Sequence, residues 1–204
     1  GNYGYGINDI GSEFGNVTEA FFANVRHGYT TNSDRIEANS NAIERFGSTA
    51  NASVKMKVLA PSNTGADTHE EAYGITFNQT EVYNAYRGLD ASGAGFSLRG
   101  KSIVVNSCLS DGCRYGVHIF EQFAGATKGI YLKDFRSLNT RGQAILINVS
   151  GSGERMSDIV IDGGYFECIR GNRLLEVSNA DVTVNNAKFI SKSNSNYSFG
   201  VYQE

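Results

Sequence analysis

The segment Asp67-Thr68-His69-Glu70-Glu71 holds the densest group of side chains capable of acid–base chemistry in this chain of 204 residues. It is the one place in the sequence where a histidine lies among three carboxylates, and the strand-like run 72–77 follows directly. The chain has only two further histidines, His27 and His118. All three histidines lie near the end of an apolar-alternating segment, just ahead of the next run of β-forming residues. This shared setting indicates that they occupy equivalent places in a repeating structure.

Alternation of apolar and polar residues predicts which of these side chains face outward. In the run 116–120, Val117 and Ile119 are expected in the core, so His118 and Phe120 face solvent. The same test places Arg99 outward.

Asp67 and His69 share one face of their segment by the same reasoning. If Val25 points inward, Arg26 points outward and His27 lies at the following turn. We therefore predict one outward column along an edge of the molecule, made of Arg26, His27, Asp67, His69, Glu70, Arg99, His118 and Glu121.

A column of this composition suits an anionic or hydroxyl-rich polymer. Carboxylates can act as general acid and base, or as a nucleophile, in glycoside hydrolysis. A histidine beside an arginine suits proton abstraction in a lyase, with the arginine neutralising the developing anion. We expect catalytic roles for Asp67, His69 and Glu70, and substrate binding by Arg26, His27, Arg99, His118, Phe120 and Glu121. Aromatic side chains expected to be exposed nearby, and able to stack on sugar rings, are Tyr29, Tyr115, Phe120 and Phe123.

Simpler interpretations of the same residues stay open. An outward histidine can be an ordinary surface residue, a Glu-Glu pair can be a solvated turn, and Asp67 can stabilise an Asx-turn. A zinc site built from His27, His69 and Asp67 is a further alternative, although the spacing is not diagnostic. The sequence calls for no cofactor, and a divalent metal remains an alternative.

The C-terminal half repeats itself, and the repeat predicts the fold. Apolar triplets at 103–105, 130–132, 159–161 and 182–184 start 27, 29 and 23 residues apart (103 to 130, 130 to 159, 159 to 182). A second series lies at 117–119, 145–147, 175–177 and 199–201, and a third apolar point falls near 109, 135–138, 165–166 and 189–190. About three short strands per unit, separated by Gly, Asn and Ser, are typical of a right-handed parallel β-helix. A β-sandwich or jelly roll is the alternative, but its strands need not repeat one another.

Earlier units are expected from 7 to 27, from 54 to 77 and up to 96–99. A polar insertion near 32–52 interrupts them, with Ser40 able to cap a short helix that Gly47 ends. Such a loop often overhangs a binding groove. We expect residues 1–204 to form a single β-helix domain that is a fragment of a longer chain.

Composition supports a turn-rich β protein and argues against some partners. The chain has 24 Gly, one Pro, no Trp, 11 Tyr and 12 Phe, and such a mixture favours many short strands joined by tight turns. A net charge of −3 argues against a nucleic-acid groove. No apolar run approaches the roughly 18 residues of a membrane span, so we expect no membrane partner. Three cysteines, Cys108, Cys113 and Cys168, lack metal-ligand spacing and are expected to be buried thiols.

Three motifs in order give the chain a family resemblance. These are Arg26-His27-Gly28-Tyr29-Thr30-Thr31, Asp67-Thr68-His69-Glu70-Glu71, and Gly95-Phe96-Ser97-Leu98-Arg99-Gly100 leading into 103–108. Together they resemble the pectate-lyase-like β-helix of bacteriophage tail spikes and pre-neck appendage proteins, over about residues 5–120. The later units match only the general β-helix pattern.

The resemblance implies a trimeric virion protein of the tail or appendage that binds, and often degrades, a host cell-surface polysaccharide or wall teichoic acid. The positions it carries over are Arg26, His27, Asp67, His69, Glu70 and Arg99. We therefore expect a depolymerase, hydrolase or lyase, within a phage adsorption apparatus. The alternatives are a non-catalytic glycan-binding or structural module, and a secreted bacterial pectate-lyase-like lyase or epimerase.

Overall fold

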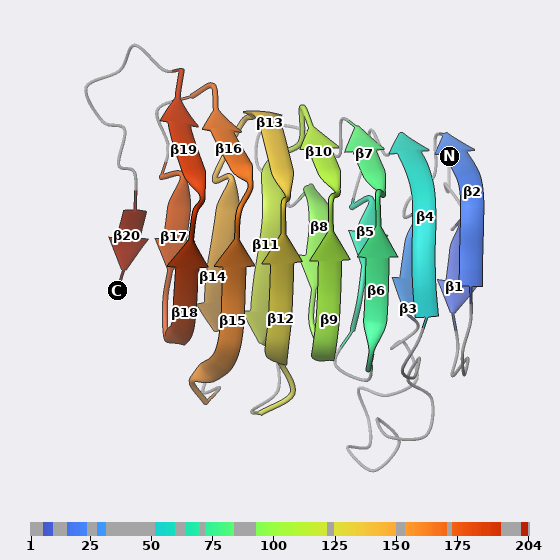
Figure 1. Cartoon of the computed structure of the whole chain (residues 1–204), viewed down its shortest axis with the longest axis horizontal. Coiled ribbons are helices and arrows are strands. Elements are labelled where there is room, and N and C mark those ends of the chain that lie inside the picture. The colour runs from blue at the N-terminus through green and yellow to red at the C-terminus, as the bar shows by residue number, and fades with distance from the viewer. Residues whose placement is uncertain are drawn as a thin grey trace.

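Short parallel strands stack along one axis to form a right-handed parallel β-helix, as predicted (Figure 1). The computed structural model describes residues 6–9, 16–23, 28–31, 52–59, 64–69, 72–83, 93–121, 125–149, 154–170, 173–192 and 201–203. Most of the polar insertion, with the expected helix at Ser40 to Gly47, lies outside these residues, and Ala52 already begins a strand. In the described part of the chain, no helix is long and apolar enough to cross a membrane.

One wall of the solenoid is a sheet of eight strands, all paired in parallel. In order along the axis they are β1 (Ile7–Asp9), β3 (Tyr29–Thr31), β5 (Ala66–Asp67), β8 (Ala94–Leu98), β11 (Tyr115–Glu121), β14 (Ile145–Val149), β17 (Leu175–Val177) and β20 (Val201–Gln203).

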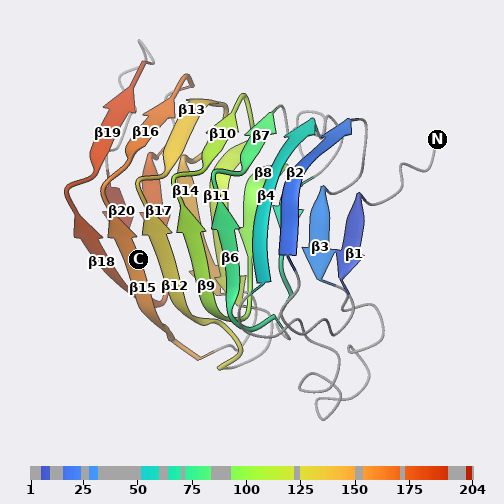
Figure 2. The same cartoon turned by 45° about the vertical axis from the view of Figure 1, so that its right-hand side comes forward.

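The second sheet has twelve strands and forms the other two walls (Figure 2). One wall contains β6 (Ile75–Asn78), β9 (Lys101–Asn106), β12 (Lys128–Lys133), β15 (Met156–Asp162) and β18 (Ala180–Asn185). The other contains β7 (Glu81–Tyr83), β10 (Leu109–Asp111), β13 (Arg136–Thr140), β16 (Tyr165–Cys168) and β19 (Lys188–Ser191).

Two long strands join these walls at the N-terminal end. β2 (Asn16–Ala23) pairs with β4 (Ala52–Leu59), and β4 pairs with both β6 and β7. Among the described residues, the first coils therefore carry two strands each, not the three predicted from the later repeat. In the later coils, residues with positive φ turn the chain between the two walls: Gln79, Ser107, Asp134, Gly163 and Asn186. Such left-handed backbone favours Gly, Asn and Asp and ends a straight strand.

The predicted repeat is confirmed residue by residue. Ile103 pairs with Ile130, which pairs with Ile159, which pairs with Val182. In the eight-stranded sheet the last pair differs from the predicted one. Leu175 starts its predicted triplet, but it pairs with Val201, the last residue of the predicted triplet 199–201. Phe199, the start of the expected final triplet, lies outside the described residues.

Inside the solenoid, aromatic rings of successive coils pack against one another. Tyr29, Phe77, Phe96 and Phe135 meet edge to face, with ring centroids 5.5, 5.7 and 5.3 Å apart. Phe166 then stacks on Phe135 at 6.1 Å. Tyr29 is 1% exposed, so the expectation that it offers an exposed ring to sugar is wrong.

The three cysteines are free and buried, as expected. Burial raises the pKa of the Cys108 thiol to about 12. At neutral pH this thiol is therefore protonated, and it acts as a small core residue.

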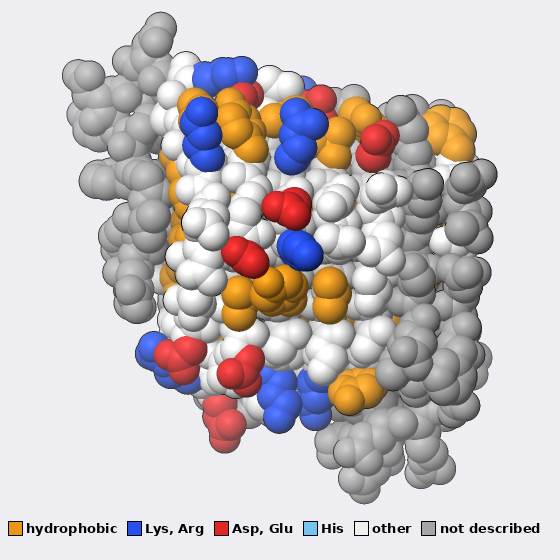
Figure 3. Space-filling view, viewed as in Figure 1, with side chains coloured by type: hydrophobic (Ala, Val, Ile, Leu, Met, Phe, Trp, Pro, Cys, Tyr) orange, Lys and Arg blue, Asp and Glu red, His pale blue; other side chains and the backbone are white. Residues whose placement is uncertain are grey.

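The outward face of the twelve-stranded sheet is mixed in character. Register places Val104, Tyr131 and Val160 side by side on β9, β12 and β15, where Figure 3 shows a hydrophobic strip with charged side chains on either side. All three side chains are partly exposed.

Replacing Phe96 tests how much the aromatic core contributes to stability. Phe96→Ala should lower the free energy of unfolding by about 3–5 kcal/mol, because it removes a fully buried ring that contacts two others. Urea denaturation measures the change. Tyr73→Ala is the control, since Tyr73 is 49% exposed and should change stability by no more than about 0.5 kcal/mol. Equal effects of the two substitutions would contradict this account of the core.

Candidate functional site

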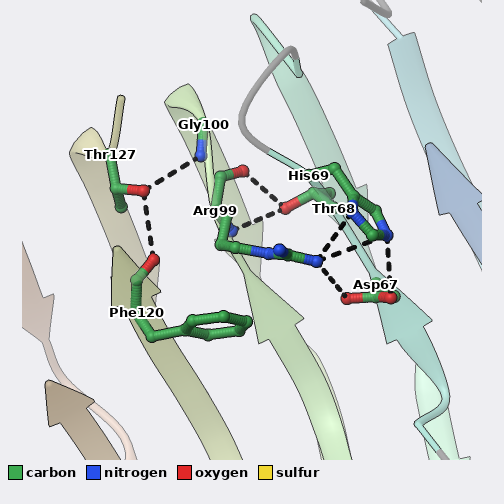
Figure 4. Close-up of polar contacts among 7 residues, drawn as sticks. All are labelled: Asp67, Thr68, His69, Arg99, Gly100, Phe120 and Thr127. Atoms are coloured by element: carbon green, nitrogen blue, oxygen red, sulfur yellow. Dashed lines mark hydrogen bonds and ion pairs between the residues drawn. The ribbon is translucent and has the colours of Figure 1, made fainter. Parts of the chain in front are cut away.

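Asp67, His69 and Arg99 meet on the eight-stranded sheet, where the chain leaves β5 and β8 (Figure 4). The Oδ2 atom of Asp67 lies 3.1 Å from Nε2 of His69. The Nη2 atom of Arg99 lies 2.7 Å from Nδ1 and 3.3 Å from Nε2 of the same ring, and 4.0 Å from Oδ1 of Asp67. We call these three residues the Asp67 cluster.

The partners of His69 select the tautomer of its neutral ring. A guanidinium can only donate hydrogen bonds, so Nδ1 of His69, which has the shorter contact to Arg99, accepts. Nε2 then carries the proton and donates it to the Asp67 carboxylate. In this tautomer the acceptor atom of His69, Nδ1, faces the positive charge of Arg99.

The cluster is largely enclosed. The side chains of His69, Asp67 and Arg99 are 17%, 11% and 9% exposed, so the imidazole is the most accessible of the three. Charges in such partial burial interact more strongly than on an open surface. The negative charge of the Asp67 carboxylate and the positive charge of the Arg99 guanidinium also cancel.

Thr68 holds the main chain of Arg99 from the interior of the solenoid. Its side chain is fully buried, because alternation turns it away from Asp67 and His69. Its hydroxyl accepts a hydrogen bond from the Arg99 N–H at 3.0 Å and donates one to the Arg99 carbonyl at 2.8 Å. Both polar groups of the Arg99 main chain are thus bonded to the coil that carries Asp67.

Three rings extend the cluster to the next strand, β11. The Arg99 guanidinium lies 4.5 Å from the centroid of the Phe120 ring, which is a cation–π distance. His118 stacks on Phe120 with centroids 4.5 Å apart, and Tyr115 lies beside His118 at 5.7 Å. Phe120 therefore links the Arg99 charge to the second described histidine.

His118 is held by the following strand, β14. Its Nε2 lies 2.7 Å from Oδ1 of Asn148, an atom that can only accept, so Nε2 carries the proton. Burial lowers the pKa of His118, and the hydrogen bond to Asn148 opposes that effect only in part. The nearby charge of Arg99 also lowers this pKa, whereas that of Asp67 raises it.

Glu121 does not lie in the outward column, and that prediction is wrong. It is 1% exposed, and its carboxylate accepts hydrogen bonds from the N–H groups of Gly125 at 2.9 Å and Thr127 at 3.0 Å. The Thr127 hydroxyl donates to the Phe120 carbonyl at 3.1 Å and accepts from the Gly100 N–H at 3.4 Å. Glu121 thus fixes the turn that supports the chain next to Arg99 and Phe120.

The structure brings together four members of the predicted column, Asp67, His69, Arg99 and His118, with Phe120. Register aligns Asp67 with Ser97 and Ser97 with His118, so His69 and His118 share one wall with Arg99. Arg26, His27, Glu70 and Phe123 lie outside the described residues. The zinc alternative needs His27 and therefore stays a prediction; within the described ranges, no group of three or more His, Cys, Asp or Glu is placed to hold a metal.

Reasoning from the sequence missed Thr68, Thr127 and Asn148. Thr68 was visible as a polar residue at an inward position, between two outward ones. Asn148 lies in register with Phe120 and could have been found by aligning the outward positions of 117–120 and 145–148. Thr127 comes from a turn without repeat spacing, so no sequence signal identified it.

No model of a known protein family matches the chain, and no solved structure matches it. Fold and site define it as a parallel β-helix protein with an Asp-His-Arg cluster on its eight-stranded wall.

The lowered pKa of His118 gives a pH dependence of stability. The unfolded chain should take up a proton at His118 near pH 6.5, whereas the folded protein should do so only at lower pH. Both states are neutral above that range, so stability is lost as pH falls below about 6.5. Histidine titration by NMR measures the midpoint, and His118→Gln should reduce the acid loss. A midpoint for His118 at or above about 6.5 would contradict the assigned burial.

Proposed function

We propose that this protein binds and cleaves an acidic polysaccharide of a host cell surface, as a domain of a bacteriophage adsorption apparatus. The observation that carries the proposal is the geometry of the Asp67 cluster, in which a carboxylate orients an imidazole and the basic Nδ1 atom faces a guanidinium. The phage setting, the virion location and a trimeric full-length protein rest on the resemblance of the three sequence motifs.

The cluster suits β-elimination from a sugar that carries a carboxylate. A substrate carboxylate would take the place of Nδ1 as the partner of the Arg99 guanidinium, which would neutralise the charge that develops on it. His69 Nδ1 would then be free to remove the proton on the adjacent carbon. The electron pair left behind forms a carbon–carbon double bond as the neighbouring glycosidic carbon–oxygen bond breaks. His69 holds the abstracted proton as an imidazolium, and the leaving oxygen takes up a proton from water.

Asp67 supports this step by keeping His69 in one tautomer. Its hydrogen bond to Nε2 leaves Nδ1 as the acceptor and stabilises the imidazolium that forms. Hydrolysis needs two carboxyl groups flanking the glycosidic bond. Asp67 could supply one, whereas Glu70, the expected second, lies outside the described residues. The lyase route needs one base and one cation, which His69 and Arg99 supply.

Substrate contacts would extend over β11 and β14. The partly exposed rings of Tyr115, His118 and Phe120 lie next to one another, and such surfaces can contact the apolar face of a sugar. Asn148 adds an amide at the same place.

A second candidate is glycan binding without cleavage. Both ring nitrogens of His69 are engaged within the protein, and a base must be released from its partner before it can accept a proton. If substrate does not draw Arg99 away, the cluster would grip an anionic polymer and leave it intact. Wall teichoic acid, whose phosphates also suit a guanidinium, is the alternative ligand for this case.

Cleavage can be tested at Asp67 and His69. Asp67→Asn and His69→Ala should each lower the rate of polysaccharide cleavage by about 10²–10⁴-fold, the usual contribution of an acid–base group. The ultraviolet absorbance of the new double bond measures elimination. Asp181→Asn and Arg155→Ala alter an exposed ion pair outside the cluster and serve as matched controls.

The products separate the candidates. New reducing ends without ultraviolet absorbance would indicate hydrolysis and would overturn the elimination route. Intact polymer that co-sediments with the protein would indicate binding alone. Full cleavage by both Asp67→Asn and His69→Ala would rule out the assigned roles.

Thr68 can be tested as a positioning residue. Thr68→Val removes the hydroxyl that bonds both main-chain groups of Arg99, so kcat should fall by about tenfold or more while the β-helix remains folded. Thr68→Ser keeps the hydroxyl and should restore most of the activity. If valine and serine at this position behave alike, the hydroxyl does not position Arg99.

A further inference from the structure

A second row of side chains lies beside the Asp67 cluster, where the chain turns from the eight-stranded wall toward β6, β9 and β12. Tyr73 forms a parallel bridge with Lys101, and Lys101 is in register with Lys128 on the next coil. Tyr73 is 49% exposed, Lys128 is exposed and Lys101 is partly exposed. The lower edge of the face in Figure 3 carries such a group of basic and hydrophobic side chains. We call Tyr73, Lys101 and Lys128 the lysine row.

The lysine row and the cluster are tied together in the same three coils. The residues that directly precede the row are all buried: Ala72, Gly100 and Thr127. The Ala72 N–H donates a hydrogen bond to the His69 carbonyl at 2.9 Å. Gly100 follows Arg99 directly, and the Thr127 hydroxyl donates to the Phe120 carbonyl at 3.1 Å (Figure 4). The main chain therefore holds each member of the row next to His69, Arg99 or Phe120.

The row and the cluster run in the same direction. Lys101 is two residues from Arg99, so their Cα atoms lie no more than about 7.6 Å apart. That separation is comparable to the length of one sugar unit. Along the row, parallel pairing places neighbouring coils about 4.8 Å apart. A polymer that lies along the solenoid axis at this corner would therefore contact both the cluster and the row.

The lysine row concentrates positive charge. Among the described residues, no carboxylate forms an ion pair with Lys101 or Lys128. Glu121 belongs to the same turn, but it is 1% exposed and its carboxylate accepts the N–H groups of Gly125 and Thr127. Like charges in register on neighbouring strands repel each other. An anion bound between the two ammonium groups would remove that repulsion.

We propose that the lysine row is a binding subsite for a second acidic sugar of the polymer, next to the unit whose carboxylate meets Arg99. The ammonium groups of Lys101 and Lys128 would hold the acid group, and the exposed ring of Tyr73 would contact the apolar face of a sugar. The subsite rests on the proposed function for the identity of its ligand, but it does not depend on cleavage. It makes the substrate a polysaccharide with acid groups on neighbouring units.

Tyr73 favours a sugar over a simpler polyanion. The ammonium of a lysine is a compact point charge that suits carboxylate, sulfate and phosphate alike, so the two lysines alone do not select among them. The aromatic ring adds a surface that a sugar ring can cover. A poly(glycerol phosphate) chain, as in a teichoic acid, offers no comparable apolar face.

Binding of short oligosaccharides measures the subsite. His69→Ala serves as the parent so that bound chains stay intact, and calorimetry at low salt gives the Kd of an oligouronate with a carboxylate on every unit. Lys101→Gln together with Lys128→Gln should raise this Kd by about fivefold or more, because two charge contacts are lost. Lys133→Gln together with Lys188→Gln makes the same change in net charge at two exposed lysines outside the row. This control should leave the Kd within about twofold of the parent value.

Two further comparisons separate the acid group from the ring. An oligosaccharide with a single uronic acid should depend less on the row, so the effect of the Lys101 and Lys128 double variant should fall to about twofold or less. Tyr73→Ala should raise the Kd of the oligouronate by about threefold. Tyr165→Ala removes a partly exposed ring outside the row and is the matched control. Circular dichroism verifies that each variant is folded.

The outcomes distinguish this subsite from the proposed function. Equal Kd values for the parent and the Lys101 and Lys128 double variant, with Arg99→Gln still weakening binding, would overturn the subsite and leave the proposed function standing. Tighter binding of poly(glycerol phosphate) than of the oligouronate, with no effect of Tyr73→Ala, would overturn an acidic sugar as the ligand. A parent that binds no oligouronate at all would overturn both proposals.

Discussion

Parallel main-chain pairing in fixed register is the constraint on which the rest of this structure depends. Each strand lies about 4.8 Å from its equivalents in the neighbouring coils. A residue is therefore surrounded by residues some 20 to 40 positions away, as in the pairs Ile7 with Tyr29 and Tyr29 with Ala66. The same rule builds the aromatic core and the row of polar side chains on the outward face.

The Asp67 cluster shows what this constraint adds to chemistry. A carboxylate, an imidazole and a guanidinium with little exposure would be costly to bury one at a time. Here the carboxylate and guanidinium balance each other, and the imidazole bonds to both. The Thr68 hydroxyl and the Phe120 ring hold Arg99 from two further directions. The protein alone thus fixes the positions of the three side chains, and only the contact between Arg99 and His69 Nδ1 would have to change when a ligand binds.

Alternation and repeat spacing were enough to predict the fold class, most later strands, and the meeting of Asp67, His69 and Arg99. They failed where a polar residue is satisfied inside the molecule or where an aromatic one belongs to the core. Glu121 is inward because loop N–H groups bond its carboxylate. Tyr29 is inward because its strand pairs with β5 so that Tyr29 faces the same side as Ala66. The two-strand coils were missed because the repeat was read from later coils, in which Gln79, Ser107 and Asp134 turn the chain.

The Asp67 cluster lies where the strands that carry it have partners on both sides. β5 pairs with β3 and β8, β8 pairs with β5 and β11, and β11 pairs with β8 and β14. Local opening at the cluster must therefore break two ladders of main-chain hydrogen bonds, whereas a strand with a single partner loses only one. Register thus protects the geometry of the cluster as well as creating it.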